Sequence, residues 1–483
     1  MNSKENEKLK LKIFNGISYL SDSYGVNWPI DQDALIFTYL SCITGGKIFI
    51  AGVPGLGKTT LAQATASVTW AIPYEIEQAA TLKCTPELTD SIINGRVHFG
   101  KLVNKGEEEA VWSITALIPG AKIVDEINRT SAGKQNIIMQ PIENGYWQVL
   151  NNVLPESEYI RTPFLAAINY DDSGTSSITP PLADRFNLLV ELKSAAGLTN
   201  LINKSKELKE RICDHDLTER IYNVINDPST NAEYKREEIK KLSEEFARNE
   251  KRKDFVLNRE DRTKIRKCLD EIIADEDAEL FIPFLDSQLT YNIYSGTEGR
   301  GELFENSKDP GARTTSSNDN HYLKYMTSHL KNNIGNRAFL SGTEDYVKAL
   351  AFLDGKKTYG IEELKLVLPY ALAHRIKWKE EITNRYIDER NDIKNYDKLN
   401  ITIFTAKQEL EQFIKEEFEP NKEHLKNIQS ILYGADTEKL EDYIRTKHLD
   451  HPYYTYLLHK IKGSQNCLYE KLMKIKKQLE EEN

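Results

Sequence analysis

The stretch IFIAGVPGLGKTTLAQATA, residues 48–66, decides the fold. It starts with an apolar, β-branched run that predicts a buried strand, and it ends in a helical pattern. The loop between them has the spacing G-x-x-x-x-G-K-[ST], with Gly52, Gly57, Lys58 and Thr59 at the defining positions. Glycines let successive backbone N–H groups curl around an anion, and the start of the following helix adds partial positive charge. The sequence therefore predicts a phosphate-binding loop between a strand and a helix.

This loop predicts a nucleoside triphosphate as the ligand. Lys58 can reach the β- and γ-phosphates, and the hydroxyl of Thr59 can complete the shell of a magnesium ion. We expect the whole loop to contact the nucleotide, which comprises Gly52, Val53, Pro54, Gly55, Leu56, Gly57, Lys58, Thr59 and Thr60. A kinase, a GTPase and an ATPase all use such a loop, so the rest of the chain must decide between them.

Another apolar run ends in two acids, Asp125 and Glu126, in AKIVDE at residues 121–126. Adjacent residues of a strand point to opposite sides, so Asp125 and Glu126 are expected to have different tasks. One can hold Mg²⁺, directly or through water, and the other can orient and deprotonate an attacking water. Next to a phosphate loop, this pair predicts hydrolysis.

Two further polar residues lie downstream. Asn169 ends the apolar run PFLAAIN, and its amide can hydrogen-bond both the γ-phosphate and the attacking water. Arg185 follows in PPLADRF and is a candidate finger for the γ-phosphate of a neighbouring subunit. A surface ion pair with Asp184 is the alternative for Arg185, and spacing alone leaves both open.

Short apolar runs alternate with helical patterns from about residue 30 to 195. Five runs are predicted to be strands: KIFIAG (47–52), PYEIEQ (73–78), AKIVDE (121–126), PFLAAIN (163–169) and FNLLVEL (186–192). Several are apolar nearly throughout, as expected for a parallel sheet that is covered on both faces. The pattern indicates an α/β domain of the wound type.

Composition restricts the function. The 483 residues carry a net charge of −10, which argues against bulk binding of nucleic acid. Neither a run of about 18 apolar residues nor a signal-peptide core is present, so we expect a cytoplasmic protein without a membrane span. The cysteines are scattered and predict free thiols: Cys42, Cys84, Cys213, Cys268 and Cys467.

The end of the chain offers HPYYTYLLH, with His451 and His459. No carboxylate stands at ligand spacing, so aromatic packing is predicted in place of a metal site. The tyrosines of this run predict either a partner surface or the core of a small helical domain.

Three motifs in order, AGVPGLGKTTLA, VDEINRTSAGKQNIIMQPIENG and AAINY…PPLADRF, resemble the MoxR branch of the AAA+ ATPases. The run Asp-Glu-Ile-Asn-Arg, followed by a helix that ends in Glu-x-Gly, is the most specific of them. KCTPELTDSIINGRVHFGKL, residues 83–102, is similar to a β-hairpin insert of this branch. Residues 335–380 are similar to its helical lid.

The resemblance implies a role for each matching residue. The matches are Gly52, Gly57, Lys58 and Thr59 in Walker A, Asp125 as the magnesium-binding acid, Glu126 as the catalytic base, Asn169 as sensor 1, Arg185 as the trans-acting finger and Arg337 as sensor 2. Asn336 stands where the branch usually has proline, so Arg375 in the next helix is a rival for sensor 2. Recognition of adenine is expected near residues 28–30.

The resemblance also implies an architecture. A wound AAA+ core would occupy residues 1–199, and an all-helical lid with a long polar loop (residues 294–320) would occupy 256–384. Between them, residues 200–255 are dense in Lys, Glu and Arg and predict a solvated helical insertion. A C-terminal helical extension would fill residues 385–483.

The implied function is hydrolysis of ATP with Mg²⁺ in a homo-oligomer, generally a hexameric ring. The branch often works with a protein that carries a von Willebrand A domain, and it remodels or matures protein complexes. An AAA+ motor or loader acting on nucleic acid is the alternative, and a scaffold that uses ATP only to assemble is a third. The acidic charge favours a protein client.

Overall fold

The computed structural model describes residues 3–24, 33–106, 108–156, 161–169, 178–192, 211–290, 342–389, 398–433, 436–449, 451, 453–454 and 457. The chain forms two compact units. The first comprises Met1–Ile273, Leu340–Tyr359 and Tyr370–His374, and the second comprises Ala274–Phe339, Gly360–Pro369 and Arg375–Asn483. None of the helices in the described ranges combines the length and the apolar content needed to cross a membrane.

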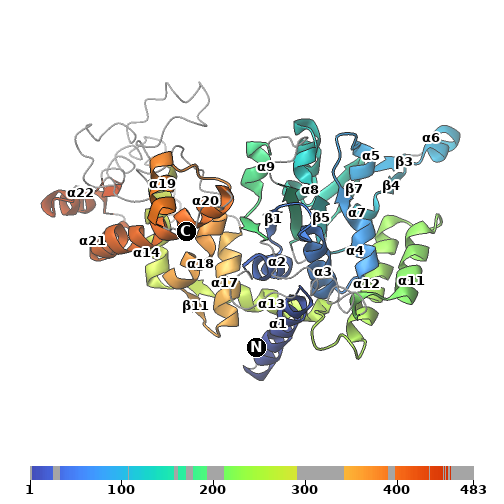
Figure 1. Cartoon of the computed structure of the whole chain (residues 1–483), viewed down its shortest axis with the longest axis horizontal. Helices are drawn as coiled ribbons and strands as arrows, with labels where there is room; N and C mark the ends of the chain where they lie inside the picture. Colours follow the sequence, from blue (N-terminus) through green and yellow to red (C-terminus); the bar gives the residue numbers. More distant parts are fainter. Residues whose placement is uncertain are drawn as a thin grey trace, which may run out of the picture. The chain divides into compact units, whose positions relative to one another are not determined.

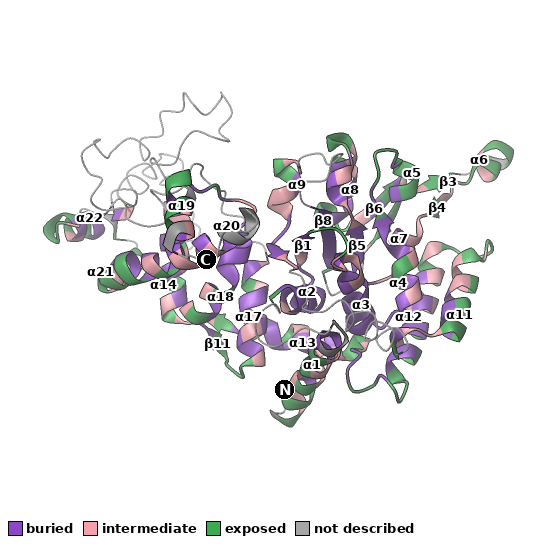
Figure 2. Cartoon of the chain, in the orientation of Figure 1, coloured by how far each residue is buried: buried purple, intermediate pink, exposed green. Residues whose placement is uncertain are grey.

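A parallel five-stranded sheet forms the centre of the first unit (Figure 1). Its strands, in spatial order, are β2 (Leu82–Lys83), β5 (Lys122–Asp125), β8 (Phe164–Asn169), β1 (Lys47–Gly52) and β9 (Leu188–Glu191). The strand interiors are buried, and β8 is buried at every position (Figure 2). The predicted α/β class, with a wound parallel sheet, is confirmed.

One of the five predicted strands is wrong. Residues 73–78 do not form a strand, because Tyr74–Ala80 is helix α4. The buried residues of α4 are Tyr74, Ile76, Glu77 and Ala80, and their separations of three and four residues are helical and not those of a strand. The strand at this edge is β2, and its two residues are too few to show a periodic pattern.

Helices surround the sheet of the first unit. Helix α3 (Lys58–Trp70) packs on β1, β5 and β8, beside α2 (Asp33–Thr44). Because Ala62, Ala64 and Ala66 are small, the backbone of α3 can approach its neighbours closely, and all three are buried. The other helices of this unit are α1 (Ser3–Tyr24), α5 (Asp90–Ile93), α6 (Phe99–Lys105), α7 (Ile114–Leu117), η1 (Ile127–Arg129), α8 (Ala132–Asn144), α9 (Pro180–Arg185), α11 (His215–Asn226), α12 (Ala232–Arg248), α13 (Arg259–Asp270) and α17 (Thr343–Leu353).

Two β-hairpins leave the core. In the first, β3 (Gly95–Val97) pairs antiparallel with β4 (Ala110–Trp112), and α6 stands at its far end (Figure 1). This confirms a hairpin in the predicted place, although its second strand lies beyond residue 102. The second hairpin, β6 (Tyr146–Val149) with β7 (Asn152–Pro155), was not predicted. The amide of Asn151 donates to Oε2 of Glu108 at 2.9 Å and so links the two hairpins.

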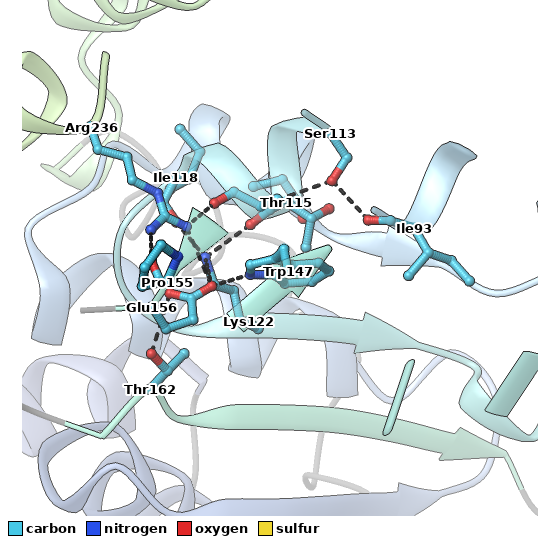
Figure 3. A network of polar contacts seen from close by, with 12 residues as sticks. Ile93, Ser113, Thr115, Ile118, Lys122, Trp147, Pro155, Glu156, Thr162 and Arg236 are labelled. Atoms are coloured by element: carbon cyan, nitrogen blue, oxygen red, sulfur yellow. Dashed lines mark hydrogen bonds and ion pairs between the residues drawn. The ribbon is translucent and has the colours of Figure 1, made fainter. Parts of the chain in front are cut away.

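A buried ionic network anchors the second hairpin to the sheet (Figure 3). Glu156 lies 3.2 Å from the ammonium of Lys122 and 3.5 Å from the guanidinium of Arg236, and it also accepts the indole N–H of Trp147. The side chains of Lys122, Glu156 and Arg236 are 1%, 5% and 9% exposed. Burial raises the pKa of Glu77 to about 8, and the charge of Lys122 opposes that shift. Of these two acids, Glu156 is the one within ion-pair distance of both cations.

We expect Glu156→Gln to lower the free energy of unfolding by about 3 kcal/mol, because two buried cations then lose their counter-charge. Urea unfolding followed by circular dichroism measures this. Glu245→Gln, in an exposed pair with Arg220, is the matched control and should change little. A loss no larger than that of the control would show that the network does not stabilise the unit.

The charged segment is helical as predicted, but it is not simply solvated. Leu217 and Ile221 of α11, and Ile239 and Phe246 of α12, are buried. The apolar residues are few, yet their spacing of three to four places them on one helix face. Residues 211–273, expected as an insertion and the start of a lid, group with the first unit.

The second unit is helical in its described part. Its helices are α14 (Glu276–Thr290), α18 (Ile361–Leu372, which belongs to this unit as far as Pro369), α19 (Glu380–Glu389), α20 (Lys398–Phe413), the π-helix η3 (Ile414–Phe418), α21 (Glu419–Tyr433) and α22 (Thr437–Thr446). Phe281, Phe284, Phe413 and Phe418 form its core. The predicted helical patterning of residues 385–483 is confirmed over the described part.

The structure also bears on the predictions for the run HPYYTYLLH and for the cysteines, over the described residues. His451 is buried, with its ring centroid 5.2 Å from that of Phe284, so aromatic packing is confirmed there. Tyr454 is fully buried, which favours a helical core over a partner surface. The four described cysteines are free thiols. His459, Cys467 and the polar loop at residues 294–320 lie outside the described residues.

Candidate active site

The phosphate loop leaves the carboxyl end of β1 and enters α3. Gly57 precedes the helix with a left-handed backbone, φ +83°, and Gly55 has the same φ. A Cβ on Gly52 would lie 2.7 Å from the carbonyl oxygen of Leu192, so only glycine fits there. Residues 53–55 are exposed, so the backbone of this loop is open to a ligand.

Lys58 lies across this loop. Its ammonium donates to the carbonyl oxygens of Gly52 and Val53, both at 2.8 Å. Burial lowers the pKa of Lys58, and the charges of Asp125 and Glu126 oppose that shift. The cation is thus folded onto the carbonyls of the loop and lies in the field of both acids.

Asp125 lies beside the start of α3. The hydroxyl of Thr59 donates to Oδ1 of Asp125 at 2.7 Å. Hydroxyl and carboxylate oxygens are hard donors, which suits Mg²⁺, an ion that usually keeps waters and phosphate oxygens as its other ligands. The two predicted metal-binding residues are therefore in contact. No group of three or more His, Cys, Asp or Glu side chains suited to a metal ion occurs in the described ranges.

Glu126 turns toward the neighbouring strand. Strand β5 ends at Asp125, and Glu126 has a left-handed backbone with φ +55°, a strained conformation for a residue with a side chain. Its Oε1 accepts the amide N–H of Asn169 at 2.7 Å, and its Oε2 lies 3.2 Å from the guanidinium of Arg129. The two acids contact different side chains, Asp125 the hydroxyl of Thr59 and Glu126 the amide of Asn169. Glu126 lies in a turn and not in the predicted strand.

The register of the sheet brings Asn169 next to the phosphate loop. Asn169 pairs with Gly52 across β8 and β1, and it is 6% exposed. Strand β8 lies between the strand of the loop and the strand of the acids. Asn169 is thereby adjacent to both.

Sequence reasoning missed Asn128. Its side-chain amide, which is buried, donates to the carbonyl oxygen of Asn169 at 2.8 Å. This bond holds the end of β8 against the turn that carries Glu126. A polar residue in the middle of the run Asp-Glu-Ile-Asn-Arg was the available signal.

Arg185 forms an ion pair with Glu143, whereas Asp184 was the partner in the alternative that spacing left open. Its Nε donates to Oε2 of Glu143 and its Nη2 to Oε1, both at 2.9 Å, and its Nη1 donates to the carbonyl oxygen of Pro181 at 2.6 Å. These bonds join α9 to α8, and none of them goes to Lys58, Asp125 or Asn169. Glu143 is a further residue that sequence reasoning did not single out.

The two lid candidates remain predictions. Arg337 and the expected adenine-binding residues 28–30 lie outside the described residues. Arg375 is described and follows α18 in the second unit.

Residues 47–186 match the family model "AAA domain (dynein-related subfamily)". The fold is similar to that of a candidate ATPase from Cytophaga hutchinsonii, seen in a crystal structure, with a TM-score of 0.52 and 17% identity over 84% of this chain and 96% of that chain. A search of curated proteins found no match. The matched segment runs from the first residue of β1 to the residue after Arg185, so it contains the hydrogen-bonded side chains of the site described above. The chain therefore carries, over residues 47–186, an AAA domain of the AAA+ ATPase class.

Proposed function

We propose that this chain hydrolyses ATP and uses the energy to remodel or mature a protein partner, as a ring-forming member of the MoxR branch. The contact between Glu126 and Asn169 carries the proposal. It brings together a carboxylate that can accept a proton and an amide that can orient water, at the end of the sheet where the phosphate loop begins.

The phosphates of ATP would lie on the backbone N–H groups of residue 53 and residues 55–59, since Pro54 has no N–H, and Lys58 would exchange its carbonyl partners for phosphate oxygens. Thr59 and Asp125 would hold Mg²⁺, which supplies charge neutralisation of the phosphate oxygens when bound. Glu126 takes a proton from the attacking water, which Asn169 orients. As the new bond to the γ-phosphorus forms, the bond to the bridging oxygen breaks, and ADP and inorganic phosphate are released.

Arg185 would act on the ATP of the adjoining subunit, where its positive charge stabilises the transferring phosphoryl group. This role requires an oligomer, and we propose a hexameric ring. Sensor 2 would be Arg337, with Arg375 as the rival, and it would act on nucleotide in its own chain.

A protein with a von Willebrand A domain is the proposed partner. The net charge of −10 opposes general attraction to nucleic acid, and this supports a protein client. Apolar side chains at the far end of the first hairpin also support contact with protein, since Phe99 and Val103 of α6 are 74% and 66% exposed.

The test uses a variant that binds ATP but does not hydrolyse it. We expect Glu126→Gln to retain a specific protein in the presence of ATP, and we expect Lys58→Ala, which loses its phosphate contact, not to retain it. The captured protein, once purified, should raise the ATPase rate of the wild type at least about 2-fold. Stimulation by DNA or RNA, with none by the captured protein, would instead favour a nucleic-acid motor.

A further inference from the structure

The pair between Arg185 and Glu143 differs from an ordinary surface ion pair in its geometry. Both carboxylate oxygens are engaged at 2.9 Å, one by Nε and one by Nη2, so the guanidinium is held along its side edge. Its third anchor is the carbonyl oxygen of Pro181, one helical turn earlier in α9. The Arg185 side chain is 17% exposed although it belongs to a short helix.

The directions of the donors show what this arrangement leaves available. A guanidinium has five N–H groups in one plane. Glu143 takes Nε–H and one Nη2–H, and Pro181 takes one Nη1–H. One N–H remains on each Nη, so the edge of the guanidinium formed by the two Nη atoms keeps donors available. That edge matches two oxygens of a phosphate, which is the geometry of a bidentate contact.

We propose that Glu143 is a positioning residue that presents this edge of Arg185 to the γ-phosphate bound by the adjoining subunit. The proposal rests on the proposed function of Arg185. Without the carboxylate, the arginine side chain would sample many rotamers, and the charge would often be out of place when the phosphoryl group transfers. Glu143 lies in the last turn of α8, the helix that follows the turn bearing Glu126.

A pair that only joined α8 to α9 would behave differently from a positioning pair. Its loss would affect stability and leave the rate per folded molecule unchanged. It would also act inside its own subunit, so no other subunit could correct the defect. The rate per folded molecule and its correction by another subunit therefore distinguish a positioning role of Glu143 from a purely structural one.

The first experiment measures the steady-state kinetics of ATP hydrolysis. Glu143→Gln should lower kcat about 10- to 100-fold, less than loss of the finger itself, and leave KM for ATP within about 2-fold, because the finger acts on the transition state. The matched control is Glu245→Gln, since Glu245 also holds an arginine by two hydrogen bonds, at 2.6 and 2.8 Å from Arg220. Its kcat should equal that of the wild type. A wild-type kcat in Glu143→Gln would overturn the proposal.

Stability is measured on the same samples by urea unfolding. The midpoints of Glu143→Gln and Glu245→Gln should agree. If Glu143→Gln is less stable than the control, Glu143→Asp separates the effect on stability from the effect on positioning. Aspartate keeps the negative charge but has a shorter side chain. Glu143→Asp should therefore recover stability while its kcat stays lowered about 10-fold. Recovery of both together would overturn the proposal.

The second experiment mixes variants in one oligomer. Glu126→Gln lacks the base but carries an intact finger, so its subunits should restore hydrolysis at the sites of Glu143→Gln subunits. The mixture should exceed the summed rates of the separate variants at least about 3-fold. Mixing Arg185→Ala with Glu126→Gln is the reference. If hydrolysis is restored only in the mixture of Arg185→Ala with Glu126→Gln, Glu143 does not position the finger. The proposed action of Arg185 on the adjoining subunit would still hold. If Arg185→Ala alone is fully active, the proposed role of Arg185 itself fails.

Discussion

Arg185→Ala is expected to lower kcat for ATP hydrolysis about 10³- to 10⁵-fold, with the dissociation constant for ATP changed less than about 3-fold. The physical reason is that the guanidinium meets its target only when charge develops on the transferring phosphoryl group. Its contacts within the chain go to Glu143 and Pro181 and not to the phosphate loop, so binding of nucleotide by the same chain should persist.

Binding can be measured by fluorescence titration with a labelled ATP analogue, and hydrolysis by release of phosphate. Arg220→Ala removes a comparable arginine that holds Glu245 in the same unit, and it serves as the control. Equal loss of binding and of turnover in Arg185→Ala would contradict a role in trans. So would a rate per subunit that does not change when the oligomer dissociates on dilution.

Glu126→Gln is expected to lower kcat about 10²- to 10⁴-fold, because an amide cannot accept the proton of the attacking water. Glutamine has nearly the same shape, and its carbonyl oxygen can still accept the N–H of Asn169, which glutamate accepts at 2.7 Å. Binding of ATP should therefore be retained. It should also be slightly tighter, since a negative charge near the phosphates is removed.

The measurement is a single-turnover assay with excess enzyme, which separates chemistry from product release. The control is Glu245→Gln, a change of the same kind in α12, away from the phosphate loop. A normal single-turnover rate in Glu126→Gln would show that another group removes the proton. A rate lost together with ATP binding would show instead that Glu126 supports the loop.

Asn128 shows which part of the site could be predicted from the sequence and which part could not. The motifs around Lys58, Asp125, Glu126 and Asn169 were visible because each ends or follows an apolar run. Their contacts, Thr59 with Asp125 and Glu126 with Asn169, agree with the predicted grouping. Asn128 was visible only as a polar residue in the run Asp-Glu-Ile-Asn-Arg, because the backbone carbonyl that it contacts lies 41 residues away.

The sequence by itself determined the local elements of this protein: the glycines of the phosphate loop, the apolar strands β1, β5, β8 and β9, and the polar residues at their ends. These follow from backbone freedom and from the burial of apolar side chains, which are properties of short segments. Only the tertiary structure decided that residues 73–78 are a helix, that Arg236 from a charged segment lies buried beside Glu156, and that Arg185 pairs with Glu143. Those outcomes depend on which side chains meet across long stretches of chain, and the energy of such contacts exists only once the chain has folded.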